Sequence, residues 1–483
     1  MEKLEHPRLS KEEAPDSGAV APMSQRTATA RTAITGRPFS YLALALLLAL
    51  LSWGYLSTLL ATAQEPWRGD YLNIYVAAHQ LLEGENPYRQ VSWEGGLAEI
   101  KRETAAASRS GVVSRPQSLL LPPVTLLLVA PFTQMPLNSS LPLFSAVSFL
   151  CLLLALLKLE RSLGLLHEDW PFKPGGHRLL LAVVLCLLFF PTWLNLCLGQ
   201  PYLLLLPIVV FLWTAVRGAN EPGAGLLLGF LITQVPGLLL LLLFFLASGR
   251  LRLVLWSLTA CLAIGLLPLL LFRSAIYLDY ASALLAAAWF GAGWNASLLG
   301  MVSPIFGASA NTPLIAAPWI AIAFCALCAA GLALLVWRLG RCLAQAERSA
   351  PHRERRHAAL TDLGFSACFP LALLIQPVSW LHSFVLVIPA MMIGLQLLLR
   401  RRHPWRWRER LILVWLLAAA PYPLVTAEAN DSALLWIGYP TFDSYALILM
   451  GLTLVGLFRR ELRGEPKEDP LASGGSLSLS SAG

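Results

Sequence analysis

Long uncharged stretches dominate the hydrophobic pattern of this chain. They show neither the alternation of a half-buried strand nor the polar face of a surface helix. They cover residues 38–64, 116–157, 179–216, 222–249, 280–337 and 363–399. Each is longer than the roughly 18–20 apolar residues that cross a bilayer as a helix. The pattern therefore predicts an all-α polytopic membrane protein.

About ten segments have the length and composition of full crossings. They are predicted at about residues 39–62, 139–158, 178–196, 201–216, 253–272, 313–337, 363–377, 383–399, 410–427 and 442–458.

Two proline-containing segments do not fit simple crossings. Residues 119–136 carry four prolines and are predicted to form a re-entrant or short, kinked helix. Residues 223–248 are interrupted at Gln234-Val235-Pro236-Gly237, which favours a hairpin of two half-length helices; one kinked helix is the alternative. Because broken helices at membrane depth are tolerated where they line a cavity, the hairpin indicates a site.

Charge separates the two sides of the membrane. The predicted crossings place 29 of the 36 Lys and Arg residues on one side, which marks that side as cytoplasmic. The loops 63–117, 273–312, 376–382 and 428–443 are then extracytoplasmic. We expect a multi-pass protein of the cell inner (plasma) membrane with both termini in the cytoplasm. Because the basic residues flank apolar spans, the bilayer is the expected partner and nucleic acid is not.

The chain ends have a different composition from the middle. Residues 1–37 and 461–483 are rich in charge, Ser, Pro or Gly and are predicted as disordered cytoplasmic tails. Residues 38–460 form the predicted transmembrane domain. Charged residues are only 13% of the chain, against roughly 25% in soluble domains, which excludes an ordinary soluble enzyme.

The first external loop contains the most informative polar segment, RGDYLNIYVAAHQLLEGENPY at residues 68–88. It predicts an amphipathic helix over 70–83 at the outer membrane surface, with Asp70 as N-cap and Gly84 ending it. The helix dipole favours an ionised carboxylate at that position. Asp70 is therefore either a helix cap or a general base for a sugar hydroxyl.

Metal chemistry is not expected from the sequence. Cys325 and Cys328 form a CxxC inside an apolar helix, without His nearby, and the external acids are dispersed. We expect metal-independent catalysis without a cofactor.

Six motifs in order resemble glycosyltransferase family 87, the GT-C class of polyprenyl-phosphate-sugar-dependent transferases. They are DYLNIYVAAHQLLEGENPY, LPPVTLLLVAPF, LGQPYLLLL, AGLLLGFLITQVP, NASL and PVSWLHSFVLVIPA. The resemblance extends over about residues 66–390. It implies a GT-C-like fold of about ten crossings with a half-helix hairpin, a re-entrant segment and an interfacial helix.

The resemblance implies roles for residues of the first external loop. Asp70 would activate the acceptor hydroxyl, and Tyr71, Tyr75 and Tyr88 would shape the sugar pocket. Interfacial anchoring is the alternative for these tyrosines.

Four further residues match family motifs or replace family residues. Gln200 and Asn295 would bind substrate, although Gln200 could instead cap its turn, and His382 would assist departure of the lipid phosphate. Gln234 stands where the family hairpin usually has Lys, and Ser383 where relatives often have a second His.

Phosphate binding therefore falls to Arg68, Arg273 or helix N-termini. The implied reaction is inverting transfer of a hexose or pentose, with mannose favoured. The donor is a polyprenyl phosphate sugar, and the acceptor is a lipid-linked or cell-envelope glycan outside the cytoplasm. The alternatives are a lipid-linked-sugar transporter or flippase and a catalytically degenerate GT-C homologue.

Overall fold

The computed structural model describes residues 24–64, 71–88, 121–163, 177–272, 275–286, 295–306, 315, 317–349, 354–400, 410, 412–415 and 441–463. Nearly all of them are helical. The strand-like pairing within these ranges is a single bridge between Asn295 and Trp380. The prediction of an all-α protein is confirmed.

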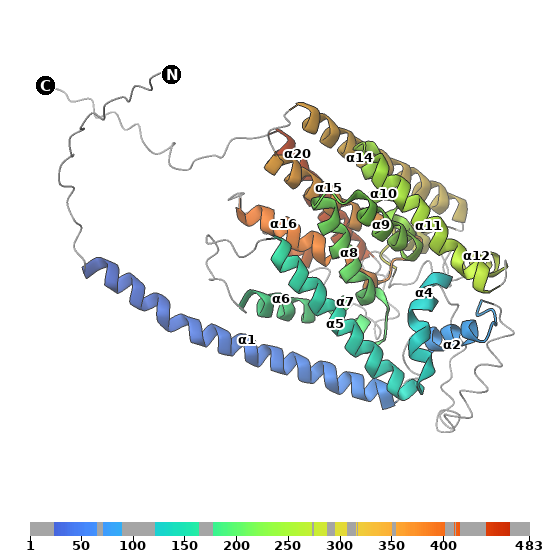
Figure 1. The fold of residues 1–483 in the computed structure, drawn as a ribbon, viewed down its shortest axis with the longest axis horizontal. Coiled ribbons are helices and arrows are strands. Elements are labelled where there is room, and N and C mark those ends of the chain that lie inside the picture. Colours follow the sequence, from blue (N-terminus) through green and yellow to red (C-terminus); the bar gives the residue numbers. More distant parts are fainter. Residues whose placement is uncertain are drawn as a thin grey trace, which may run out of the picture.

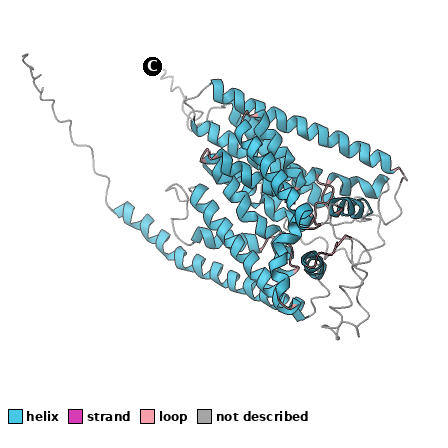
Figure 2. Ribbon diagram, turned by 45° about the vertical axis from the view of Figure 1, so that its right-hand side comes forward, coloured by secondary structure: helices cyan, strands magenta, loops and turns pink. Residues whose placement is uncertain are grey.

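The helices pack side by side in one bundle, with the long helix α1 running along its edge (Figures 1 and 2). Their bounds are α1 Ser24–Gln64, α2 Tyr71–Leu82, α4 Pro123–Val129, η3 Ala130–Gln134, α5 Leu137–Leu163, α6 His177–Leu187, α7 Phe190–Cys197, α8 Tyr202–Arg217, α9 Glu221–Gln234, η4 Pro236–Leu238, α10 Leu239–Ala247, α11 Leu251–Leu271, α12 Ile276–Ala286, α13 Leu298–Phe306, α14 Pro318–Ser349, α15 Glu354–Ile375, η6 Leu381–Val387, α16 Ile388–Arg400 and α20 Thr441–Arg463.

Six helices in the described part of the chain are long and apolar enough to cross a membrane. They lie in α1, α5, α11, α14, α15 and the continuous segment of η6 and α16. A seventh is obtained if α6 and α7, bent by 76° at Leu188 and Phe189, count as one span. Helix α8 has only 16 residues, and most of the predicted span 410–427 lies outside the described residues. The chain is a multi-pass membrane protein, and the number of ten crossings stays a prediction.

The chain ends differ in part from the expected tails. Helix α1 begins at Ser24, inside the segment 1–37 that we expected to be a tail, and α20 ends at Arg463. Residues 1–23 and 464–483 lie outside the described residues.

The helix of the first external loop is present as α2, where the spacing predicted it. Gly84 follows it with φ of +77°, a left-handed conformation that suits glycine, and its N–H donates to the Leu81 carbonyl. Eight of its twelve residues are buried. Its apolar face packs against α4 and η3. The helix is therefore held by protein contacts, more than a helix lying on lipid would be.

The segment 119–136 contains the short helix that its prolines predict. From residue 121 onward it is seven residues of α-helix, α4, followed by five residues of 3-10 helix, η3. Pro123 begins α4, a position where the missing N–H costs no helical hydrogen bond.

The break at Gln234 separates α9 from α10, and the two helices return to the same end of the bundle. The guanidinium of Arg250, just after α10, donates to the carbonyl of Val216, just before α9 begins. One kinked crossing would put these residues on opposite sides. The contacts therefore agree with the hairpin and not with the kinked helix.

Close approach of glycines joins α9 to α11. A Cβ added at Gly229 would lie 2.3 Å from the Ser257 carbonyl oxygen, and one at Gly225 would lie 2.5 Å from the Cβ of Trp256. Small residues four apart let two membrane helices approach at backbone distance. The first arm of the hairpin is thereby fixed to a helix of membrane length.

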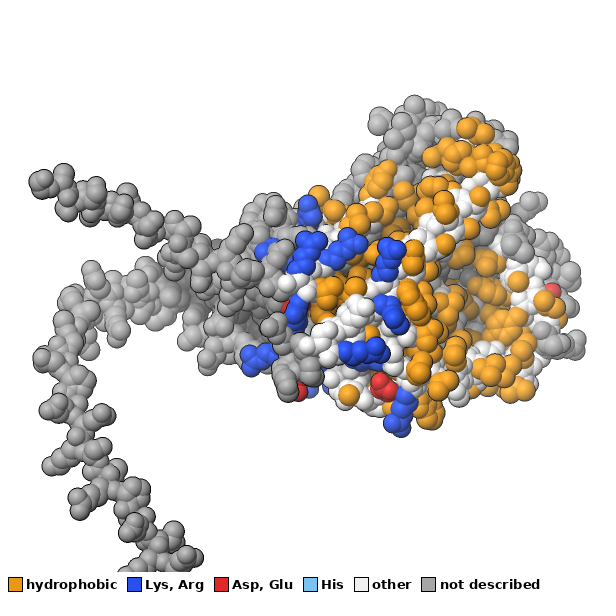
Figure 3. Space-filling view, turned by 90° about the horizontal axis from the view of Figure 1, so that it is seen from above, with side chains coloured by type: hydrophobic (Ala, Val, Ile, Leu, Met, Phe, Trp, Pro, Cys, Tyr) orange, Lys and Arg blue, Asp and Glu red, His pale blue; other side chains and the backbone are white. Residues whose placement is uncertain are grey.

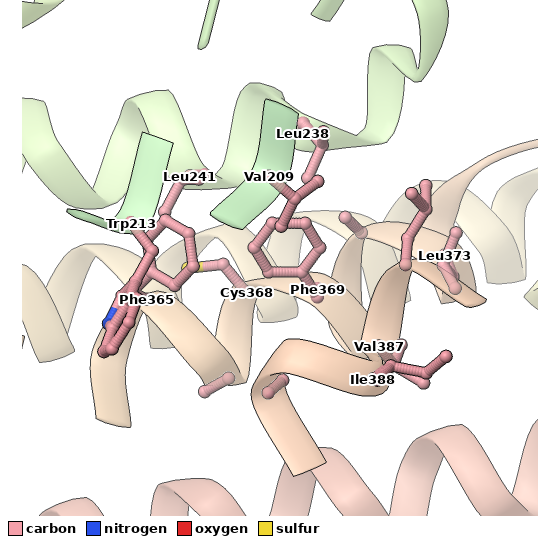
Figure 4. Close-up of a cluster of buried hydrophobic side chains, with 14 of the residues drawn as sticks. Val209, Trp213, Leu238, Leu241, Phe365, Cys368, Phe369, Leu373, Val387 and Ile388 are labelled. Atoms are coloured by element: carbon pink, nitrogen blue, oxygen red, sulfur yellow. The ribbon is translucent and has the colours of Figure 1, made fainter. Parts of the chain in front are cut away.

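The core lies where the hairpin meets α8, α15 and α16. Figure 4 shows Val209 and Trp213 of α8 facing Phe365 and Phe369 of α15, with Leu238 above them. Apolar side chains also remain exposed along α1, α11 and α14, as expected for helices that face lipid. Figure 3 shows hydrophobic side chains beside a group of Lys and Arg side chains on one face of the molecule.

Basic residues hold helix ends together at the end of the bundle away from Gln234. Arg217 donates to the Ser162 carbonyl and pairs with the buried Asp362 at 3.2 Å. Arg356 donates to the carbonyls of Glu461 and Leu462 at the end of α20. The loops at this end are those predicted to be cytoplasmic.

Candidate active site

Four of the residues singled out in the sequence lie buried at the same end of the bundle. Gln200 precedes α8, Gln234 ends α9, Asn295 precedes α13 and His382 lies in the first turn of η6. All four are less than one tenth exposed. Buried polar side chains are usually hydrogen-bonded, so the surroundings of each residue bear on its role.

Tyr71 and Tyr75 attach α2 to this end of the bundle. The Tyr71 hydroxyl and Ser140 Oγ are 2.7 Å apart, and the Tyr75 hydroxyl donates to the Met135 carbonyl at 2.7 Å. Burial raises the pKa of the Tyr71 phenol to about 12, so it stays a neutral hydrogen-bonding group at physiological pH. Both hydroxyls bind protein groups, so these tyrosines help to hold α2 in place.

Gly199 brings the turn before α8 against the start of α2. Its φ is +69°, and a Cβ there would lie 2.5 Å from Cδ2 of Tyr71. Glycine alone permits both this backbone conformation and this contact. The Gly199-Gln200 turn is thereby pressed against the residue that follows Asp70 in the chain.

Tyr88 lies beside a second aromatic ring and an acid. Its hydroxyl donates to the Leu121 carbonyl at 2.7 Å, and its ring is 5.3 Å from that of Tyr280. Nearby, Asn86 Nδ2 donates to Asp279 Oδ2 at 2.6 Å. The end of the external loop is thus linked to α12.

His382 lies between two aromatic rings. Its ring centroid is 5.0 Å from that of Tyr202 and 5.6 Å from that of Trp380. No hydrogen bond joins either ring nitrogen to another group in the part of the chain that the structure describes. Within the described residues, the imidazole is therefore oriented by ring packing.

Gln234 and Asn295 are engaged within the protein. Gln234 Oε1 accepts from the Thr125 hydroxyl at 2.6 Å, which connects the hairpin to α4. Asn295 Oδ1 accepts from the Ser379 N–H at 2.9 Å, and its Nδ2 donates to the Pro377 carbonyl at 3.0 Å. Asn295 therefore fixes the turn that leads to His382.

Three predicted site residues lie outside the described residues: Asp70, Arg68 and Arg273. Within the described ranges, no group of three or more His, Cys, Asp or Glu residues is arranged to hold a metal ion.

Sequence reasoning missed two polar residues of this region. Asp279 lies in the predicted loop 273–312, six residues after Arg273, and its carboxylate accepts a hydrogen bond from Asn86. Asn195 lies five residues before Gln200 in an apolar run, and its side chain binds the His382 carbonyl at 2.8 Å. A lone amide within an apolar stretch was the available signal for Asn195.

Comparison with known proteins identifies the family. The family model described as Glycosyltransferase family 87 matches residues 120–354. The match includes Gln200, Gln234 and Asn295 but neither Asp70 nor His382, and is shorter than the resemblance over 66–390. No curated protein and no solved structure matches the chain. With its match over residues 120–354 and its bundle of membrane-length helices, the chain belongs to glycosyltransferase family 87 and is a multi-pass membrane glycosyltransferase.

Proposed function

We propose that the protein transfers a hexose or pentose, with mannose favoured, from a polyprenyl phosphate sugar to a lipid-linked or cell-envelope glycan. The reaction takes place on the extracytoplasmic face of the inner (plasma) membrane, with both termini in the cytoplasm and the bilayer as the medium of the donor. The observation that carries the proposal is the contact of Tyr71 with the Gly199-Gln200 turn. Only one peptide bond, about 3.8 Å between Cα atoms, separates Tyr71 from Asp70.

The proposed reaction is an inverting displacement. The Asp70 carboxylate accepts the proton of the acceptor hydroxyl, whose oxygen forms a bond to the anomeric carbon of the donor sugar. The bond from that carbon to the phosphate oxygen breaks, and the polyprenyl phosphate leaves with the electron pair. A ring N–H of His382 hydrogen-bonds the departing phosphate oxygen. This fits an imidazole that packs against Tyr202 and Trp380 and whose ring nitrogens form no hydrogen bond within the described residues. The step uses no metal or cofactor.

Phosphate recognition is the point where this chain departs from the family pattern. The amide of Gln234 is neutral, and its oxygen accepts a hydrogen bond from the Thr125 hydroxyl. The positive charge in the proposal comes from Arg68 or Arg273, which flank the external helix and α12 in sequence.

The test uses membranes that contain the wild type or Asp70→Asn, incubated with radiolabelled polyprenyl phosphate sugars. Loss of the base lowers transfer by about 10²–10⁴-fold. Glu85→Gln is the matched control, because Glu85 is an exposed acid of the same loop, and it keeps wild-type activity.

Other outcomes distinguish the alternatives. Transfer that survives Asp70→Asn but is abolished by Asp279→Asn moves the base to Asp279. Donor movement across the membrane without transfer favours a transporter or flippase. Donor binding without transfer by the wild type favours a degenerate homologue.

A further inference from the structure

Asn195 connects two segments that were singled out separately in the sequence. It lies in α7 with a fully buried side chain. Its Nδ2 donates to the Pro191 carbonyl one turn earlier and to the His382 carbonyl, both at 2.8 Å. Its own carbonyl accepts the Gln200 N–H at 3.1 Å. One residue therefore binds the backbone of the LGQP turn and of the WLHS turn, although His382 is 187 residues away.

The segment that Asn195 holds is otherwise positioned mainly by packing. His382 belongs to η6, a seven-residue 3-10 helix that is buried throughout and whose hydrogen bonds are poorer in geometry than those of an α-helix. Within the described residues its imidazole is placed by ring packing against Tyr202 and Trp380, without a hydrogen bond. The bond from Asn195 to the His382 carbonyl adds a directional anchor at the residue that carries the ring.

The amide at this position has a cost that an apolar side chain would avoid. Asn195 Oδ1 is buried and has no hydrogen-bond partner in the described part of the chain. An unsatisfied buried acceptor is unfavourable, whereas a leucine of similar size would leave no such atom. The two N–H groups are thus the part of the side chain that the fold uses.

We infer that Asn195 is a positioning residue that holds the His382 and Gln200 turns in one fixed arrangement. The inference deepens the proposed function: a displacement of about 1 Å in a group that contacts substrate can cost about 10²-fold in rate. Through Gly199, the same connected set reaches Tyr71 and the start of α2.

Hydrogen exchange tests the inference without any substrate. In the purified full chain, Asn195→Leu removes the side-chain hydrogen bond to the His382 carbonyl and should speed amide exchange in peptides of 381–387 by about tenfold. Peptides of 198–203 should change less, because the Gln200 N–H binds the main-chain carbonyl of residue 195, which the variant keeps. The matched control is Thr192→Val, since Thr192 lies one turn away in α7, is equally buried, and has a hydroxyl without a partner. It should leave both peptides unchanged.

A second variant covers a failure of Asn195→Leu to fold. In Asn195→Ser the short hydroxyl can still bind the Pro191 carbonyl but cannot reach that of His382. Exchange should then rise only in 381–387. Unchanged exchange in that turn, or an equal rise throughout the bundle, would overturn the inference.

The functional readout separates this inference from the proposed function. Once a sugar that the wild type transfers is known, Asn195→Ser should lower kcat more than it raises KM. In a His382→Gln background the same change should lower the transfer rate little further. Equal losses in both backgrounds would show that Asn195 does not act through His382. If the wild type transfers nothing, the proposed function fails while the exchange result still decides the role of Asn195.

Discussion

Asp362 is a buried acid inside the apolar helix α15. Its carboxylate accepts from Trp213 Nε1 at 2.8 Å and pairs with Arg217 at 3.2 Å. Asp362→Asn would leave a partly buried guanidinium without its counter-ion, and we expect a loss of about 3 kcal/mol in the free energy of unfolding. Unfolding titrations in detergent measure it. The matched control is Glu347→Gln, which removes the more exposed pair of Glu347 with Arg250 at 3.9 Å and should cost under about 1 kcal/mol. Equal losses in the two variants would show that the Asp362–Arg217 pair is not especially stabilising.

At the same scale, residue types were easier to predict than their partners. Gln200, Gln234, Asn295 and His382 were singled out because they match motifs of the family or replace its residues, and all four are buried at one end. The contacts of Asn295 with Ser379 and Pro377 join segments over eighty residues apart, which spacing does not reveal. The roles of Asp70, Arg68 and Arg273 stay predictions.

At the level of elements, the contact of α9 with α11 depends on the absence of a side chain at Gly229. We expect Gly229→Ala to lower the free energy of unfolding by about 1–3 kcal/mol, because the added Cβ would overlap the Ser257 carbonyl. The matched control is Gly265→Ala in α11, where nothing lies within 4 Å. That variant should be neutral or up to about 1 kcal/mol more stable. Equal destabilisation of both variants would show that the effect is not contact with α11.

Helices were predicted best where local signals were strong. Gly84 correctly marked the end of α2, the prolines of 119–136 correctly indicated a short helix, and the Gln234–Gly237 segment correctly marked the break between α9 and α10. The 76° bend between α6 and α7 was missed, because Pro191 and the apolar run around it read as one continuous span. The start of α15 at Glu354 was missed as well, since the charged residues before Leu363 suggested a loop.

For the whole molecule, the hairpin and the charge separation together predict which residues share a side of the membrane. In a cysteine-free background, Asn220→Cys and Gly249→Cys lie at exposed turns before α9 and after α10. A membrane-impermeant maleimide should label both only after the cells are opened. Glu85→Cys, exposed after α2, should react in intact cells. Labelling of Asn220→Cys and Gly249→Cys from opposite sides would mean that residues 221–247 cross the membrane once.

Helix α8 has 16 residues and spans about 24 Å, and α9, with 14, spans about 21 Å, against a hydrocarbon layer of about 30 Å. Such hydrophobic mismatch is relieved when the leaflet thins locally around the short helices. We expect the ends that carry Gln200 and Gln234 to lie in a locally thinned part of the membrane. In the proposed reaction, the phosphate headgroup of the donor would reach them with its own leaflet, without drawing its lipid chain out into water.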